Sequence, residues 1–412
     1  MHTEGENLTT MDSSFQDRVI SLGTGLAGIP ERLLLAHARG EVLFICGAGI
    51  SKPAPANLPD FGELVLDVYK ALDAGVYAIL SNPFEELKTD WDALTANLTH
   101  RQKAETKRFM AKDFDVVLGM LERRLDGQTQ GDSQVRRTVA NRLRAAKSAP
   151  APLHKVLMRL ADRGGATTIV TTNFDLLLEA AGKRPKQSTQ TYALGSIPRP
   201  TRHKQFSGVM HIHGALDPNP ERTSELVLSD QDFGEFYLRR RVVPDFIYDA
   251  ARLYHLVLVG YSANDPPMRY LLNAVAADGT RFDDLKERFT FFGTEGADPV
   301  ALEDWKARGI TPINYKIKDN HQALLQSLEK WAKFSAVNGE QDAVDREIRR
   351  IVKLSRAESN EPDCDLFDHF IRRSSANERV RLSGLASDAG AELGWLNAIV
   401  AIGKEKSRLQ KS

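Results

Sequence analysis

Residues 42–51 read VLFICGAGIS, an uncharged apolar run that ends in a Gly-x-Gly turn and a hydroxyl. Such a run is typical of a buried parallel strand. Glycines let the backbone approach a pyrophosphate, and the N–H groups of the turn then point at the anion. Lys52 stands where the dinucleotide fingerprint has its third glycine, and no Gly-Lys-Ser/Thr follows, so a nucleoside-triphosphate P-loop is excluded. The stretch predicts the first strand and turn of an α/β domain, with dinucleotide binding and a purely structural turn both open.

The composition narrows the class of protein. The chain has 412 residues with 42% hydrophobic and 27% charged residues, which suits two or three soluble globular domains. Lys and Arg equal Asp and Glu at 55 each, so direct nucleic-acid binding is not expected. No apolar run reaches the roughly 18–20 residues that cross a bilayer, and the polar start MHTEGE is unlike a secretory signal. We therefore expect a cytoplasmic protein without membrane association.

Cysteine usage argues against a metal centre. The chain has only Cys46, inside the apolar run, and Cys364, and it contains no Cys-x-x-Cys pair. Two thiols cannot build a four-cysteine zinc site. We therefore expect no zinc and no other metal ligands.

Hydrophobic periodicity predicts three regions. Residues 1–40 read as a flexible tail (about 1–12) followed by short helices over 15–22 and 33–38. Residues 317–412 read as helical, including a helix over 385–400 that glycines interrupt. Between them, residues 41–316 alternate strands and helices, apart from an all-helical insertion at about 62–160. Strands are predicted at 42–46, 167–171, 208–212, 225–228, 256–260, 289–292 and 310–315. This alternation predicts an α/β fold, a Rossmann-like parallel sheet with helices on both faces.

Polar residues follow several predicted strands. Asn173 and Asp175 come just after one strand, His211 and His213 lie at the end of the next, and the turn 260–266 follows a third. Because the carboxyl ends of parallel strands meet at one edge of a sheet, we expect these residues to converge on a ligand. An Asn or Asp in this position is also an ordinary helix N-cap, so each residue alone has a structural interpretation.

Five motifs, taken in order, resemble those of the sirtuin NAD-dependent superfamily over roughly residues 40–316. They are GAGIS at 47–51, PDF at 59–61, TTNFD at 171–175, HG at 213–214 and GYS at 260–262. The resemblance implies a catalytic set of Asn173, Asp175 and His213, with His213 as the base. The NAD-binding residues that it implies are Gly47, Ala48, Gly49, Ser51, Asp60, Phe61, Gly260, Ser262 and Asn314.

Departures from the sirtuin pattern refine this expectation. Deacetylating sirtuins carry a four-cysteine zinc ribbon between the HG and GYS motifs, where this chain has no cysteine, and Gly62 stands where sirtuins usually have Arg. The segments 225–230 and 260–265 look instead like bacterial sirtuin-like proteins of antiphage defence, which hydrolyse NAD. The helical regions look most like the sirtuin-like subunit that works with a HerA-type ATPase.

The resemblance therefore implies an NAD hydrolase, with NAD as substrate, that forms a homo-oligomer and assembles with a HerA-type ATPase. Three alternatives stay open: an NAD-dependent protein deacylase, an ADP-ribosyltransferase, and a non-catalytic sensor of NAD or ADP-ribose. The helical regions then serve either oligomer and partner contacts or simply the completion of the core.

Overall fold

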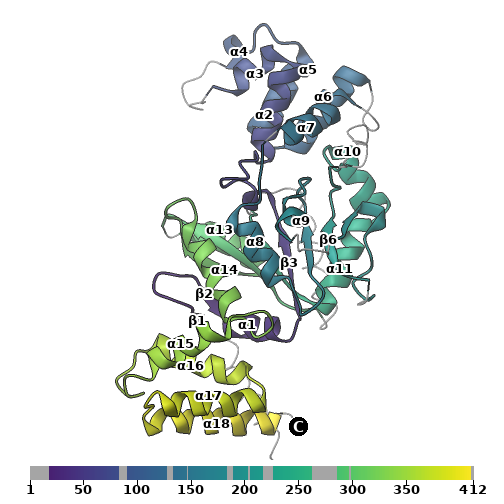
Figure 1. Ribbon diagram of the computed structural model, residues 1–412. Coiled ribbons are helices and arrows are strands. Elements are labelled where there is room, and N and C mark those ends of the chain that lie inside the picture. The colour runs from purple at the N-terminus through teal and green to yellow at the C-terminus, as the bar shows by residue number, and fades with distance from the viewer. Residues whose placement is uncertain are drawn as a thin grey trace, which may run out of the picture.

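A seven-stranded, fully parallel sheet forms the centre of the molecule (Figure 1). The computed structural model describes residues 18–82, 91–127, 133–145, 147–182, 189–202, 205–216, 226–261, 285–296 and 298–409. The strand order is β5-β6-β4-β3-β7-β8-β9. The strands are β3 (Val42–Cys46), β4 (Thr168–Thr171), β5 (Thr191–Ala193), β6 (Gly208–His211), β7 (His255–Val259), β8 (Arg288–Thr294) and β9 (Ile310–Lys316). The predicted Rossmann-like parallel sheet is confirmed, and the 42–46 strand is its fully buried middle.

The two faces of the sheet are covered by different helices. Side chains alternate along β3, so Val42 and Phe44 enter one core and Leu43 and Ile45 enter the other. The first core includes α1 (Glu31–Ala38), α8 (Pro152–Leu160) and α14 (Gln322–Phe334); the second includes α11 (Val242–Leu253) and α13 (Pro299–Ala307). An apolar strand buried on both sides thus explains the uncharged run in the sequence.

A helical insertion stands above the carboxyl ends of the strands (Figure 1). It comprises α2 (Phe61–Leu72), α3 (Ala74–Leu80), α4 (Trp91–Leu94), α5 (His100–Met110), α6 (Phe114–Asp126) and α7 (Gln134–Ala145). The insertion has an apolar core of its own, which Leu226 and Leu228 complete. The strand predicted at 225–228 is wrong for its described residues 226–228, which are irregular and buried. Their backbone N–H groups form hydrogen bonds outside the sheet. The Val227 N–H donates to the His213 carbonyl, and the Leu228 N–H donates to the Asp232 carboxylate.

A buried arginine joins the insertion to the chain beyond the sixth strand. Arg136 on α7 is fully buried and forms ion pairs with Glu122 at 3.0 Å and with Asp232 at 2.5 Å. Its guanidinium also donates to the Leu226 carbonyl at 2.6 Å. Asp232 lies on α10 (Asp230–Phe233), where its carboxylate also accepts from Ser229. The insertion is therefore fixed to α10 by a charged group that water does not reach.

The N-terminal part of the described chain differs from the prediction. The helix expected over 15–22 is wrong for the described residues, because β1 (Val19–Ser21) pairs antiparallel with β2 (Gly28–Pro30). The apolar positions of 15–22 fill so short a window that helix and strand periods cannot be distinguished. Ile20 and Ile29 of this hairpin are fully buried in the core that covers the sheet.

The C-terminal region is helical and shares its core with the sheet. After α14 come α15 (Gln341–Ile351), α16 (Glu361–Arg373), α17 (Ala376–Asp388) and α18 (Leu393–Leu409). The helix expected over 385–400 with interruption by glycines is two helices, because Gly390 adopts the left-handed conformation (φ 81°) that ends α17. Apolar residues of α16–α18 belong to the same core cluster as the residues of β3. The helical region that begins after residue 316 therefore shares this core with the sheet.

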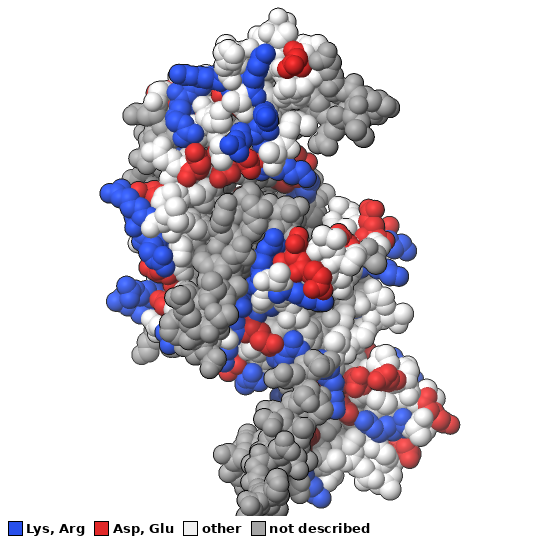
Figure 2. All heavy atoms as spheres, turned by 180° about the vertical axis from the view of Figure 1, so that it is seen from behind, with Lys and Arg blue, Asp and Glu red and all other residues white. Residues whose placement is uncertain are grey.

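Charged side chains of both signs cover the face of the molecule drawn in Figure 2. Lys and Arg gather over the helical insertion at the top of this view, Asp and Glu lie just beneath them, and the signs are mixed lower down. Among the helices that the structure describes, none combines the length and apolar composition needed to cross a bilayer.

Replacing the buried arginine will destabilise the fold. Arg136→Ala leaves Glu122 and Asp232 without their cation, and breaking a buried pair in this way costs about 3–5 kcal/mol. Chemical denaturation measures the loss. Arg123→Ala is the matched control, since Arg123 also links α6 to α10 through Asp230 but is partly exposed, and it is expected to cost at most about 1 kcal/mol. Equal losses for both variants would contradict the role given to Arg136.

Candidate active site

The glycine turn after β3 packs directly against the turn after β7. A Cβ on Gly47 would lie 2.7 Å from the Gly260 carbonyl oxygen, and a Cβ on Gly49 would lie 2.9 Å from the Gly260 Cα. The Gly49 N–H donates to that same carbonyl at 3.0 Å. Gly260 itself has a φ of 78°, which favours glycine. Contact between the two turns is therefore enough to require these glycines, whatever ligand they meet.

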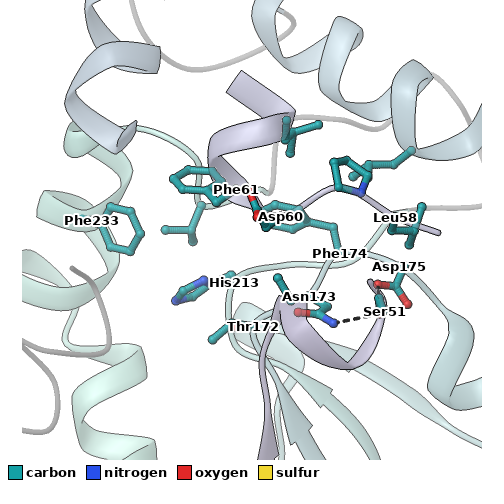
Figure 3. A pocket seen from close by; sticks show the side chains of 15 residues that line it. Ser51, Leu58, Asp60, Phe61, Thr172, Asn173, Phe174, Asp175, His213 and Phe233 are labelled. Carbon is teal, nitrogen blue, oxygen red and sulfur yellow. Dashed lines mark hydrogen bonds between the residues drawn. The ribbon is translucent and has the colours of Figure 1, made fainter. Parts of the chain in front are cut away.

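The Ser51 hydroxyl forms hydrogen bonds with two of the polar residues predicted at the strand ends. The Asn173 amide donates to the Ser51 hydroxyl at 3.1 Å and to the Gly47 carbonyl at 3.2 Å. The Ser51 hydroxyl donates to Asp175 at 3.0 Å. Figure 3 shows Asn173 between this Ser51–Asp175 pair and His213. The turns after β3 and β4 are thus joined through side chains, as the convergence of strand ends predicts.

His154, on α8, is part of the same network and was not expected from the sequence. Its Nε2 lies 3.1 Å from the Ser51 hydroxyl, and its Nδ1 accepts from the Ala151 N–H at 3.1 Å. Burial lowers the pKa of His154, so the neutral ring carries its proton on Nε2 and donates to Ser51. Because this contact joins residues 103 positions apart, no local pattern signals it. Ser51 is consequently held by three partners and is not available as a free nucleophile.

His213 is a buried and neutral imidazole in the wall of the cavity. Only 7% of the residue is exposed, and its Nε2 lies 2.5 Å from the hydroxyl of Tyr237. Phe233 meets the ring edge-on, with the centroids 5.5 Å apart. Burial lowers the pKa of His213 to about 3. The ring is therefore unprotonated near pH 7 and can accept a proton.

His211 differs from His213 in the direction of its pKa shift and in its place outside the cavity wall. Its Nδ1 lies 2.8 Å from the Asn173 carbonyl oxygen and its Nε2 lies 2.8 Å from the Glu179 carboxylate. Burial lowers the pKa of His211, but the hydrogen bond and charge of Glu179 outweigh it, so the pKa is raised above its ordinary value. His211 does not line the cavity. It holds the backbone that carries Asn173.

Ser51, Asn173, Asp175 and His213 line one cavity at the carboxyl ends of β3, β4 and β6. Its volume is about 100 Å³, and it is partly open to solvent. The predicted residues in its wall are Ala48, Ser51, Asp60, Phe61, Asn173, Asp175 and His213.

The other predicted contacts lie elsewhere. Gly47, Gly49 and Gly260 form the two packed turns and are not part of the cavity wall. Asn314 is exposed on β9, which β7 and β8 separate from β3, and it does not reach the cavity. Ser262 lies outside the described residues.

Asp60 and Phe61 begin the helical insertion at the rim of the cavity. Asp60 caps α2 in a capping box with Glu63, and Lys52 bridges the two carboxylates at 2.6 and 3.1 Å. The lysine that replaces the third glycine therefore ties the turn to α2. Phe61 packs edge-to-face on Phe114, and a Cβ on Gly62 would lie 2.9 Å from that ring. This contact explains a glycine after the PDF motif.

Within the described ranges, no group of three His, Cys, Asp or Glu side chains is arranged to hold a metal ion. Cys46 is buried in β3 and Cys364 lies half-buried on α16. Burial raises the pKa of the Cys46 thiol far above its ordinary value, so this thiol stays protonated.

Part of the chain is similar to a known protein family. Residues 167–313, which carry Asn173, Asp175 and His213, match the family model of the SIR2-like domain. This stretch is similar to a SIR2-like domain, in keeping with the resemblance of the motifs to the sirtuin superfamily.

Two individual proteins are similar to the chain. The uncharacterized protein y4cA of Sinorhizobium fredii (strain NBRC 101917 / NGR234) is 34% identical over 365 residues, which are 84% of this chain and 28% of that protein. The chain thus spans just over a quarter of the length of this curated relative. A solved structure described as "Structural Basis for the Mechanism and Regulation of Sir2 Enzymes" covers 73% of this chain and 96% of its own, at 14% identity and a TM-score of 0.34, a likeness too remote to add an argument.

The buried histidines make stability depend on pH. His213 titrates at about 3 when folded and near 6.5 when unfolded, so its contribution is complete above pH 6.5 and is lost as the pH falls toward 3. Between pH 7.5 and 5 this loss amounts to about 2 kcal/mol. In urea titrations, His213→Gln is expected to show an acid loss smaller by about that amount.

His211→Gln is the contrasting variant. The raised pKa of His211 gives stability that is complete below pH 6.5 and is lost as the pH rises through the folded value, so its removal enlarges the acid loss. The same direction of change in both variants would contradict the two assignments.

Proposed function

We propose that the chain is an NAD⁺ hydrolase that cleaves NAD⁺ to nicotinamide and ADP-ribose. The observation that carries the proposal is the meeting of Ser51, Asn173, Asp175 and His213 at one small cavity of a SIR2-like domain. We place the nicotinamide end of the substrate in this cavity, beside Asn173 and His213. The rest of NAD⁺ then extends along the open part of the cleft.

The network around Ser51 suits the cleavage of an N-glycosidic bond. The bond breaks with positive charge developing on the ribose, while nicotinamide leaves as a neutral molecule. The Asp175 carboxylate offsets that charge. Asn173 donates its amide hydrogens to Gly47 and Ser51, so its carbonyl oxygen is the group that it offers to the carboxamide or to water.

His213 supplies the base that hydrolysis needs. A water molecule attacks the ribose C1′ as the bond to nicotinamide breaks, and the proton of that water has to leave. A neutral buried imidazole accepts it, or accepts the proton of a ribose hydroxyl that assists. General base catalysis of this kind contributes about 10²–10⁴-fold.

The choice of water over acyl-lysine as the nucleophile rests on the segment after His213. The chain has no cysteine between Gly214 and Gly260 to build a zinc ribbon. In the described part of this interval, α10 and the helical turns after it bring Phe233 and Tyr237 against His213. Aromatic side chains here support a closed cavity for NAD⁺ and water.

The cellular setting is part of the proposal. Unrestrained loss of NAD⁺ kills a cell, so we place the activity in bacterial antiphage defence by NAD⁺ depletion, in the cytoplasm. Assembly as a homo-oligomer with a HerA-type ATPase would provide the control. Nicotinamide release by the purified chain, alone and with the ATPase, and the native mass of the mixture test this arrangement.

Substitution of the two central residues tests the activity itself. Asn173→Ala and His213→Ala are each expected to lower nicotinamide release at least about 100-fold, because each removes a group that touches the reacting atoms. Chromatography of nicotinamide and ADP-ribose measures the loss. His321→Ala, at the start of α14 and outside the cavity wall, serves as the control and retains activity.

The product pattern separates the proposal from its rivals. Full cleavage by both variants would refute the assignment, and circular dichroism would verify that they fold. O-acetyl-ADP-ribose formed with an acetylated peptide would indicate a deacylase, and tight NAD⁺ binding without nicotinamide release would indicate a sensor.

A further inference from the structure

We propose that Tyr237 is a positioning residue for His213: its hydroxyl oxygen accepts the Nε2–H of the ring, which leaves the Nδ1 lone pair as the base. This inference rests on the proposed function and goes beyond it. It names a group that no sirtuin motif of the sequence contains and that acts from outside the cavity wall.

The pair is close and shielded from water. The Tyr237 hydroxyl lies 2.5 Å from His213 Nε2, and each residue is only 7% exposed. Hydrogen bonds gain strength where the surroundings exclude water, and a buried polar atom that loses its partner costs free energy. Tyr237 therefore fixes the orientation of the imidazole.

A π-helical segment brings Tyr237 to this place. The chain leaves α10 at Phe233 and continues as η3 (Gly234–Arg239), a π-helix, which is a rare geometry found often at functional sites. The rings of Phe233 and Tyr237 lie 5.3 Å apart, and both contact His213. The imidazole is thus held between two aromatic side chains of one segment.

The start of this segment is anchored to the helical insertion. Ser229 caps α10, and Asp232 is bound by the buried Arg136 of α7. Movement of Tyr237 away from the ring would therefore disturb a charged group that has no access to water. Such an anchor suits a residue whose task is to hold another in place.

Burial lowers the pKa of both histidines, and the partner of each ring decides whether that effect is opposed. Glu179 raises the pKa of His211 because a carboxylate favours the imidazolium. A phenol brings no charge, and the pKa of His213 stays low. A tyrosine in place of a carboxylate therefore keeps the imidazole neutral while it still fixes the tautomer.

Tyr237→Phe tests the kinetic consequence, since it removes one oxygen and keeps the ring. The kcat of nicotinamide release is expected to fall about 10- to 100-fold, as for other groups that orient a functional imidazole, while the KM for NAD⁺ changes less than about twofold. Tyr315→Phe is the matched control, because Tyr315 bonds Nδ1 of His321 at 2.9 Å outside the cavity and its loss should leave kcat unchanged. An unchanged kcat in Tyr237→Phe would overturn the proposal.

Nitrogen-15 NMR of histidine-labelled protein tests the tautomer without any turnover. The signal of His213, assigned by its loss in His213→Gln, is expected to show a protonated Nε2 and a bare Nδ1 in the wild type, and a mixture of tautomers in Tyr237→Phe. A proton on Nδ1 in the wild type would refute the inference. If no variant or wild-type protein releases nicotinamide, the proposed function fails, and the tautomer result still decides the role of Tyr237.

Discussion

The hydroxyl of Ser51 is the point on which the candidate site depends. It binds Asn173, Asp175 and His154, which come from the turn after β4 and from α8, while Ser51 itself follows β3. One small side chain thus joins three elements above the sheet. The position of Ser51 is set by the close contact between the glycine turns after β3 and β7. The space between Gly49 and Gly260 is too small for a Cβ on Gly49.

A second constraint comes from the helical insertion, which forms part of the site and is more than an addition to it. Phe61 at the start of α2 lines the cavity, and Arg136 on α7 holds the segment that carries Phe233 and Tyr237. The wall of the cavity is therefore built from the insertion and from the chain after β6.

His211 and His213, two positions apart on the chain, show how the surroundings of a histidine affect its protonation. Both are buried, yet Glu179 favours the charged form of His211, whereas the hydroxyl of Tyr237 leaves His213 neutral. His211, whose charged form Glu179 favours, supports the backbone of Asn173, and the ring of His213 lines the cavity. The same residue type thus supports the backbone in one position and, in the proposed function, accepts a proton in the other.

The sequence by itself determined the parallel sheet, the glycine turn and the meeting of Asn173, Asp175 and His213, because strand burial, turn chemistry and the order of motifs leave local patterns. Only the tertiary structure decided the hairpin β1–β2, the irregular course of residues 226–228, and the parts played by His154, Arg136 and Tyr237. Those residues act through partners as many as 103 positions away, and no periodicity or spacing along a chain records such a contact. It arises only when the faces of the sheet and the insertion are packed together.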